Sequence, residues 1–173
     1  MNFLRRRPKL PVAHRPSLEP DERVLAWAAV SDDNFLIATN RGLWRPDHGR
    51  LGWHEIHQAA WSGDELRITP AEVAEERVGY PVLVDGPVLA YRLPDPGELP
   101  DQVRTRVTRS VAYTAHYPLP VGGVRVVARR ISGVDGLSWA VRYDSGTPVD
   151  LDEVAAVTDE LVRAARDATA PPG

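Results

Sequence analysis

The chain has 173 residues, of which 43% are hydrophobic, and its formal net charge is −3. This length suits one domain or a domain with an extension, and the composition suits a protein with a buried core. The absence of cysteine excludes disulfides, thiolate nucleophiles and thiolate-bound metals. Because no apolar run approaches the roughly 20 residues that a membrane span needs, we expect a cytoplasmic location.

Residues 1–17 are rich in proline and in basic side chains, and we expect a mobile, disordered arm. Such an arm could attach the protein to anionic lipid at the inner face of the membrane, at about 1 kcal/mol per basic residue. The alternative is a solvated tail. The residues that would make the attachment are Arg5, Arg6, Arg7 and Lys9.

Short apolar runs alternate with turn signals between residues 23 and 93, which is typical of a meandering antiparallel sheet. Residues 78–84 and 87–93 predict a hairpin around Asp85-Gly86, a strong turn dipeptide. Between residues 70 and 77 we expect a helical turn or a loop. The other expected strands are residues 23–30, 34–39, 42–44, 51–61 and 65–69.

Apolar residues at helical spacing then predict a helix that starts near 97–100 and ends near 116–118. Its stripe is Leu99, Val103, Val107, Val111 and Thr114. Residues 124–131 and 137–143 predict a second hairpin. The residues Asp150 to Glu153 predict a capping box that opens a last helix. Its expected apolar face is Leu151, Val154, Val157, Leu161, Ala164 and Ala168.

Two stretches carry a family resemblance, LIATNRGLW at residues 36–44 and LGWHEIHQAAWSGDELRIT at residues 51–69. They resemble bacterial pleckstrin-homology-like (PH-like) and GRAM-like domains, in which a threonine precedes a turn with a basic residue. The resemblance covers residues 18–117. It implies an α+β fold, a PH-like antiparallel β-barrel or sheet capped by an amphipathic helix. Residues 118–170 would then form a β-hairpin and helix packed on it.

The resemblance also implies a non-enzymatic intracellular binding module, most often for a protein partner. In this chain the first strand–strand loop, residues 31–33, carries two aspartates. Two carboxylates would repel phosphates, so phosphoinositide recognition at that loop is disfavoured. The whole chain is similar to actinobacterial proteins of this length as well, and that similarity implies no activity.

The sequence lacks the common catalytic and nucleotide-binding motifs. No nucleotide-binding glycine loop and no nucleophile elbow is present. His54 and His57 are three residues apart, and on a strand they would point to opposite faces. We therefore expect no catalytic, cofactor or metal residues. The alternative is an enzyme of unknown reaction with a pocket between the barrel and the extension.

The most concentrated positive signal lies on the second hairpin, where Arg125 and Arg129 share one strand face and Arg142 lies on the facing strand. We expect these three arginines to form a face that binds an anion or an acidic partner. The alternative is a solvated face whose charge is neutralised by the acids of the last helix. Trp139 and Tyr143 alternate away from Arg142, which disfavours nucleic acid because stacking needs aromatics on the same face.

Overall fold

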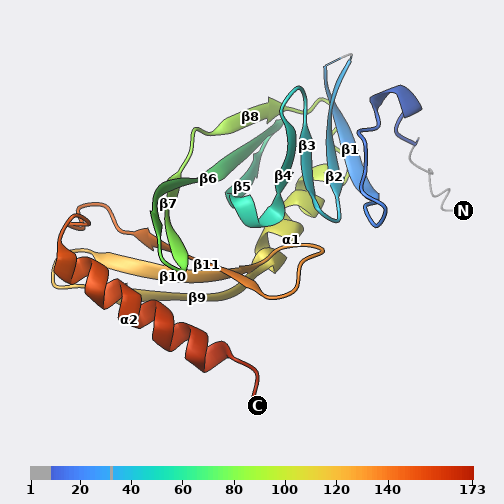
Figure 1. Ribbon diagram of the computed structural model, residues 1–173. Helices are drawn as coiled ribbons and strands as arrows, with labels where there is room; N and C mark the ends of the chain where they lie inside the picture. Colours follow the sequence, from blue (N-terminus) through green and yellow to red (C-terminus); the bar gives the residue numbers. More distant parts are fainter. Residues whose placement is uncertain (1–8, 32) are drawn as a thin grey trace, which may run out of the picture.

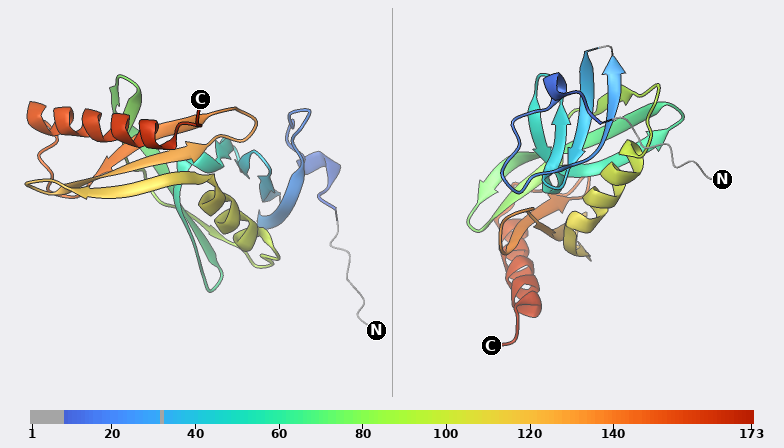
Figure 2. Two further views of the ribbon diagram at one scale, coloured as in Figure 1. Left: turned by 90° about the horizontal axis from the view of Figure 1, so that it is seen from below. Right: turned by 90° about the vertical axis from the view of Figure 1, so that its right-hand side faces the viewer.

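The computed structural model describes residues 9–31 and 33–173 and has an α+β fold, as expected (Figure 1). Two sheets and the helices α1 and α2 make up the described part of the chain. The four-stranded sheet and α2 lie at opposite ends of the molecule (Figure 2). In chain order the elements are η1 (Val12–His14), β1 (Val24–Ser31), β2 (Asn34–Thr39), β3 (Gly42–Arg45), β4 (Gly49–Gly52), η2 (Trp53–Glu55), β5 (Ile56–Ser62), β6 (Glu65–Arg77), β7 (Tyr80–Asp85), β8 (Leu89–Arg92), α1 (Leu99–Ser110), β9 (Val111–Pro118), β10 (Gly123–Arg130), β11 (Leu137–Tyr143) and α2 (Asp152–Thr169).

The first sheet is an antiparallel meander in the order β1-β2-β3-β4. A two-residue turn joins β2 to β3, and the Thr39 hydroxyl oxygen accepts hydrogen bonds there from the backbone N–H groups of Arg41 and Gly42. A side chain that satisfies two backbone donors fixes the turn locally. The expected strand over residues 51–61 is instead divided into β4, a 3-10 turn and β5.

The second sheet has seven strands, in the order β5-β6-β7-β11-β10-β9 with β8 also on β6. It is mixed rather than antiparallel throughout, because β7 and β11 run parallel, with Val82 opposite Val141. The sheet also continues across the expected boundary between residues 117 and 118, since β9 pairs with β10 along its length.

The prediction of a hairpin turn at Asp85-Gly86 is wrong. The turn lies earlier, at Val78-Gly79, where Gly79 has φ +89°. Residues 70–77, expected as a helical turn or a loop, belong to the long strand β6. Asp85 lies opposite Ala71 and Leu89 lies opposite Ile68, so β7 and β8 follow β6 in almost one register. Asp85-Gly86 therefore interrupts an extended strand.

Helix α1 ends at Ser110, earlier than the expected 116–118. Val111, whose ψ is +114°, turns the chain directly into β9, which pairs with β10. Val111 and Thr114 do fall at helical spacing, but Val111 and Thr114 are also β-branched, and with Tyr113 and Tyr117 they suit a strand. Strand pairing decided between the two patterns, as tertiary context often does.

Helix α2 forms where expected, but the capping box does not. Leu151 is the N-cap residue, and no side chain donates or accepts a capping hydrogen bond. The buried residues of α2 are Thr158, Val162 and Ala165, one position away from the expected stripe. Val157 is therefore exposed.

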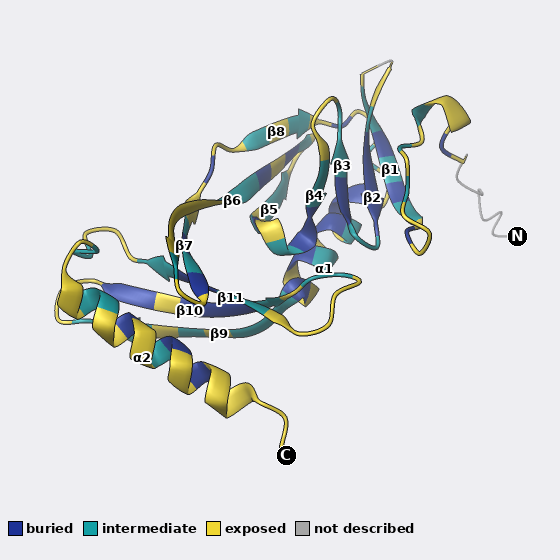
Figure 3. Cartoon of the chain, viewed as in Figure 1, coloured by how far each residue is buried: buried dark blue, intermediate teal, exposed yellow. Residues whose placement is uncertain are grey.

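The apolar residues form two clusters, and buried positions gather in β2, β3, α1 and β10 (Figure 3). In the first cluster, Leu43 of the meander packs with Ile68 of β6 and Val107 of α1, so the helix covers the space between the two sheets. Each such fully buried side chain is worth about 1.5–3 kcal/mol. The second cluster joins β10 and β11 to α2.

Part of the expected N-terminal arm is packed. Leu10 is buried, and the His14 ring lies 4.4 Å from that of Phe35 on β2. Lys9 is exposed. Arg5, Arg6 and Arg7 lie outside the described residues, so lipid attachment through them stays a prediction.

Candidate functional site: a basic face on the seven-stranded sheet

Strand pairing places basic side chains in a row across three strands. Arg125 of β10 lies opposite Arg142 of β11 on one side and opposite His116 of β9 on the other. Residues that face each other across adjacent strands point to the same side of the sheet. Other polar side chains reach this side from other elements. We call the whole set the basic face, and its members are His57, Asp85, His116, Arg125, Arg129 and Arg142.

Helix α2 covers the other side of these strands. Val124, Val126 and Val141 pack against Val162 and Ala165 of α2. Because side chains alternate along a strand, the three arginines point away from the helix. The acids of α2 therefore do not neutralise them, and that part of the alternative is wrong. Its other part, a solvated face, is not contradicted, since Arg125 is exposed. The predicted separation of the aromatic side chains from Arg142 is confirmed, since Trp139 and Tyr143 pack in the α2 cluster.

Asp85 is the carboxylate that links the elements of the basic face. Its Oδ1 atom accepts a hydrogen bond from Arg142 Nη2 at 2.5 Å and another from His57 Nδ1 at 2.7 Å. The interruption of β7–β8 therefore places Asp85 between β11 and β5. A charge-assisted hydrogen bond of this kind is short and directional, so Asp85 holds Arg142 and His57 in fixed positions.

The imidazole of His57 is buried, with 3% of the side chain exposed. Because a carboxylate can only accept, Nδ1 carries the proton in the bond to Asp85. Nε2 is buried and has no hydrogen-bond partner among the described residues. Burial lowers the pKa of His57, Arg142 and Arg129 lower it further, and Asp85 only partly opposes them. His57 is therefore neutral at pH 7, with a lone pair on Nε2.

Arg129 is half-buried and joins β10 to the first half of the chain. Its Nη1 atom donates to the backbone oxygen of Ile56 at 2.8 Å, to Ser110 Oγ at 3.0 Å and to the backbone oxygen of Trp53 at 3.4 Å. Burial lowers the pKa of Arg129, and the nearby charge of Arg142 lowers it further. All three partners are neutral, so Arg129 is positioned but its charge is not compensated.

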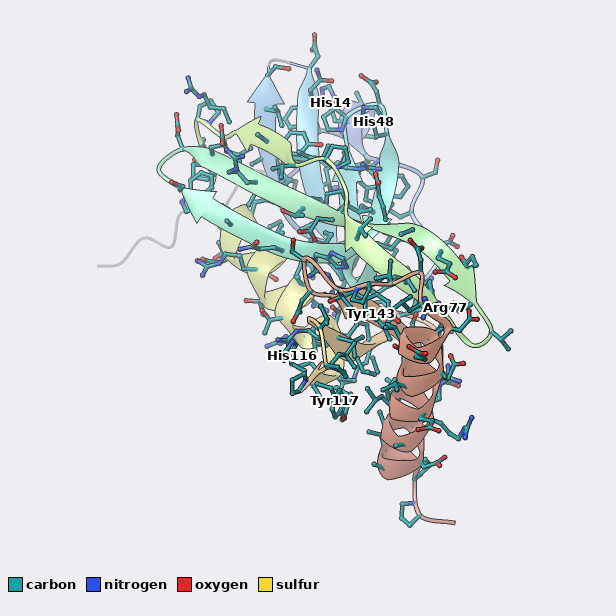
Figure 4. All side chains as sticks on the ribbon, turned by 90° about the vertical axis from the view of Figure 1, so that its left-hand side faces the viewer. His14, His48, Arg77, His116, Tyr117 and Tyr143 are labelled. Atoms are coloured by element: carbon teal, nitrogen blue, oxygen red, sulfur yellow. The ribbon has the colours of Figure 1, made fainter. Side chains whose placement is uncertain are left out.

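Arg125 and His116 form the exposed end of the basic face. Arg125 donates from Nη1 to Thr114 Oγ1 at 3.1 Å, and in the described part of the chain it has no carboxylate within ion-pair distance. His116 Nε2 lies 2.7 Å from Asp144 Oδ2 and so has its own acidic partner. Figure 4 labels His116 on the edge strand β9.

The charges of the basic face do not balance. Three guanidinium groups face one carboxylate, Asp85, because Asp144 is taken by His116. Like charges directly opposite on adjacent strands, such as Arg125 and Arg142, are destabilising. A face with this surplus favours an anionic ligand, and its groups are hydrogen-bond donors suited to oxyanions.

His54 and His57 do not converge. His54 lies near Glu55, with a nitrogen–oxygen distance of 3.8 Å, whereas His57 binds Asp85. Within residues 9–31 and 33–173, no group of three or more histidine, aspartate or glutamate side chains is arranged to hold a metal ion. The two histidines thus have separate local roles.

A groove of about 630 Å³ lies between the β6–β7 turn and α2. Two of its polar side chains have side-chain partners: Tyr80 donates to Asp159, and Arg77 donates to the hydroxyl of the neighbouring Tyr143 at 2.7 Å. Arg77 and Tyr143 lie beside α2 (Figure 4). The Tyr80–Asp159 bond thus links β7 to α2 across this groove.

The sequence predicted the three arginines of the face but not Asp85, because Asp85 was assigned to a hairpin turn and was given no other role. His57 was interpreted as an ordinary polar or strand-end histidine, with a metal ligand or a member of an enzyme pocket as the alternatives. No local signal connects either residue with Arg142, because Asp85 and Arg142 are 57 positions apart. The sequence hint was negative, namely that the two strands that carry the three arginines contain no acidic residue.

Comparison with known protein families, characterised proteins and solved structures finds no match to this chain. Among the residues that the structure describes, neither α1 nor α2 has the length and apolar character to cross a bilayer.

Proposed function

We propose that this protein is a non-enzymatic binding module built on a PH-like barrel, and that it recognises a protein partner. The PH-like assignment is supported by the four-stranded meander that packs with β5, β6 and β8, and by α1, which covers the space between them. The sequence resemblance covers the same elements. The assignment predicts a binding role without predicting the ligand.

The observation that carries the proposal is the uncompensated charge of the basic face. Arg125 is exposed and has only Thr114 as a side-chain partner, while the acids of α2 lie on the other side of the sheet. An acidic segment of a partner would supply the missing negative charge. Arg125 and Arg142 would contact it first, because they lie at the accessible end.

The test is affinity capture with the full chain as bait, compared with two charge-reversed variants. Arg125→Glu changes the basic face. Arg104→Glu makes the same change at an exposed position on α1 and is the matched control. We expect a stoichiometric partner that the wild type and Arg104→Glu capture and that Arg125→Glu loses. Loss of the partner with both variants, or with neither, would contradict the assignment of the site.

Attachment to lipid through the arm makes a different prediction. Sedimentation with anionic vesicles would then depend on residues 1–17 and would not respond to Arg125→Glu. The two experiments separate a protein-binding face from a membrane-binding arm.

A further inference from the structure

The basic face changes character from one end to the other. At its outer end Arg125 is exposed, and at its inner end His57 is almost fully buried. Between them lies Arg142, whose side chain is 36% exposed. A ligand that enters over Arg125 therefore reaches Arg142 first and meets His57 last.

The inner end has an unsatisfied polar atom. His57 Nε2 is buried and has no hydrogen-bond partner in the described chain, although nearly all buried polar atoms in native proteins have one. Its ring cannot turn freely, because Nδ1 is held by Asp85. Nε2 is thus a fixed, buried position beside two arginines, and a bound group can complete it.

We propose that the inner end of the basic face binds a phosphoryl group between Arg142, Arg129 and His57, with one proton shared between the phosphoryl oxygen and His57 Nε2. The inference rests on the proposed function, because it assigns the chemistry of the acidic group that the same face recognises. The phosphoryl group belongs to a phosphorylated side chain of the partner or to free phosphate.

The charge of the site favours a dianion over a carboxylate. With His57 neutral, Arg125, Arg129 and Arg142 exceed Asp85 by two positive charges. A phosphoryl group carries about −1.5 to −2 at pH 7 and has three strong acceptor oxygens. A carboxylate has two oxygens in one plane and is satisfied by one guanidinium. The donors here come from three strands, β5, β10 and β11.

The shared proton gives the site a pH dependence. The charged groups that face His57 are Asp85 from β7, Arg142 from β11 and Arg129 from β10. In the free protein the arginines and burial keep His57 neutral. A bound dianion offsets the arginines, so protonated His57 becomes favourable and Nε2 becomes a donor. Binding therefore takes up a proton, and affinity rises as the pH falls.

The experiment uses the full chain, with inorganic phosphate as the probe and acetate as the carboxylate comparison. The imidazole nitrogen signals of His57 are followed by NMR between pH 6 and pH 8. We expect phosphate to shift the His57 signals saturably and to raise its pKa, with acetate at least about tenfold weaker, since one pKa unit of coupling corresponds to a factor of ten.

Two variants test the residues. His57→Gln keeps an amide donor for Asp85 but cannot take up a proton. In this variant the affinity for phosphate should vary with pH only as far as phosphate itself changes its charge. The additional pH dependence that comes from His57 should be lost. Arg142→Gln should weaken phosphate binding by about tenfold or more, whereas Arg104→Gln should leave it unchanged. Circular dichroism and the melting temperature show that each variant is folded.

The outcomes separate the two proposals. No saturable effect of phosphate at His57, equal binding of acetate, or an unchanged pH profile in His57→Gln overturns the phosphoryl site. The binding module survives such a result if capture still depends on Arg125. Loss of capture after phosphatase treatment of the lysate identifies a phosphorylated partner. If phosphate binds as expected but capture resists phosphatase, the source is free phosphate.

Discussion

The carboxylate of Glu22 allows the sharpest test of how the meander is held together. Its side chain has 0% exposure and accepts four hydrogen bonds. Arg50 and Thr39 donate at 2.6 Å each, Trp44 Nε1 at 3.0 Å and the backbone N–H of Glu19 at 3.1 Å. The start of β1 is thereby bound to β2, β3 and β4 at one point. The substitution Glu22→Gln keeps the shape and removes the charge.

The cost can be estimated from these contacts. A hydrogen bond to a charged group is worth about 1.5–3 kcal/mol. Thr39 is buried and cannot turn to water, while Arg50 is 26% exposed and can be partly rehydrated. The glutamine oxygen still accepts one bond. We expect Glu22→Gln to lower the free energy of unfolding by about 2–3 kcal/mol, or the melting temperature by about 5–10 °C for a chain of this size.

The effect must also depend on pH. Burial raises the pKa of Glu22, but the hydrogen bonds from Thr39, Arg50, Glu19 and Trp44 outweigh it and hold the pKa below its ordinary value of 4.5. The charged form is favoured by folding, so this stabilisation is fully present above pH 4.5 and is lost as the pH falls through the folded pKa. The difference between wild type and Glu22→Gln should therefore shrink towards pH 3.

Urea unfolding at pH 7 and pH 3 measures both quantities. Glu19→Gln removes an exposed carboxylate three positions away and is the control, with an expected change within about 0.5 kcal/mol. A cost equal to that of the control, or a cost that stays constant from pH 7 to pH 3, would refute the reasoning about Glu22.

Two further predictions concern the second half of the chain. Burial and the bond to Asp159 raise the pKa of Tyr80 to about 12. The contribution of this phenol to stability is therefore intact below pH 10 and is lost as the pH rises towards 12. Tyr80→Phe should lower the free energy of unfolding in urea at pH 7 by about 1–2 kcal/mol, and the variant should not show that loss of stability at alkaline pH. Gly122 has φ +78°, and a Cβ there would lie 2.8 Å from Thr147 Cβ and 2.9 Å from its Cα. Gly122→Ala should therefore lower the melting temperature by several degrees more than the control Gly146→Ala. Gly146 has a similar φ of +85° but open space around it. Equal losses in the two variants would show that only the backbone angle matters.

The parts of the fold that could be predicted from sequence are those that local chemistry decides. The β2–β3 turn is fixed by the Thr39 side chain, and the β10–β11 hairpin joins two strands of clear alternation through a glycine-containing loop. In both cases the residues that determine the structure lie within a few positions of each other. The strands therefore formed close to their expected positions.

The errors arose where a distant partner decided the structure. Residues 111–118 satisfy a helical and a strand pattern, and only β10 selects the strand. Asp85-Gly86 has the composition of a hairpin turn, but β6 is long enough to pair with the chain on both sides of it. The α2 stripe was displaced by one residue because Thr158, a polar residue, is buried and donates to the backbone oxygen of Val154 at 2.7 Å.

The parallel pairing of β7 with β11 is the step that creates the candidate site. Each hairpin alone is antiparallel and local, and the arginines of β10 and β11 would then be an ordinary solvated surface. The parallel contact is short, with Val82 opposite Val141, and its polar continuation is the Asp85–Arg142 bond. The carboxylate that joins the two hairpins is thus also the one that holds His57 and Arg142 in the proposed site. Because Asp85 both joins the sheet and holds the donors of the proposed site, its substitution would change stability and recognition together. Arg125 takes no part in the Asp85 contacts, and its only side-chain partner among the described residues is the exposed Thr114. Arg125 is therefore the residue at which recognition is best separated from stability.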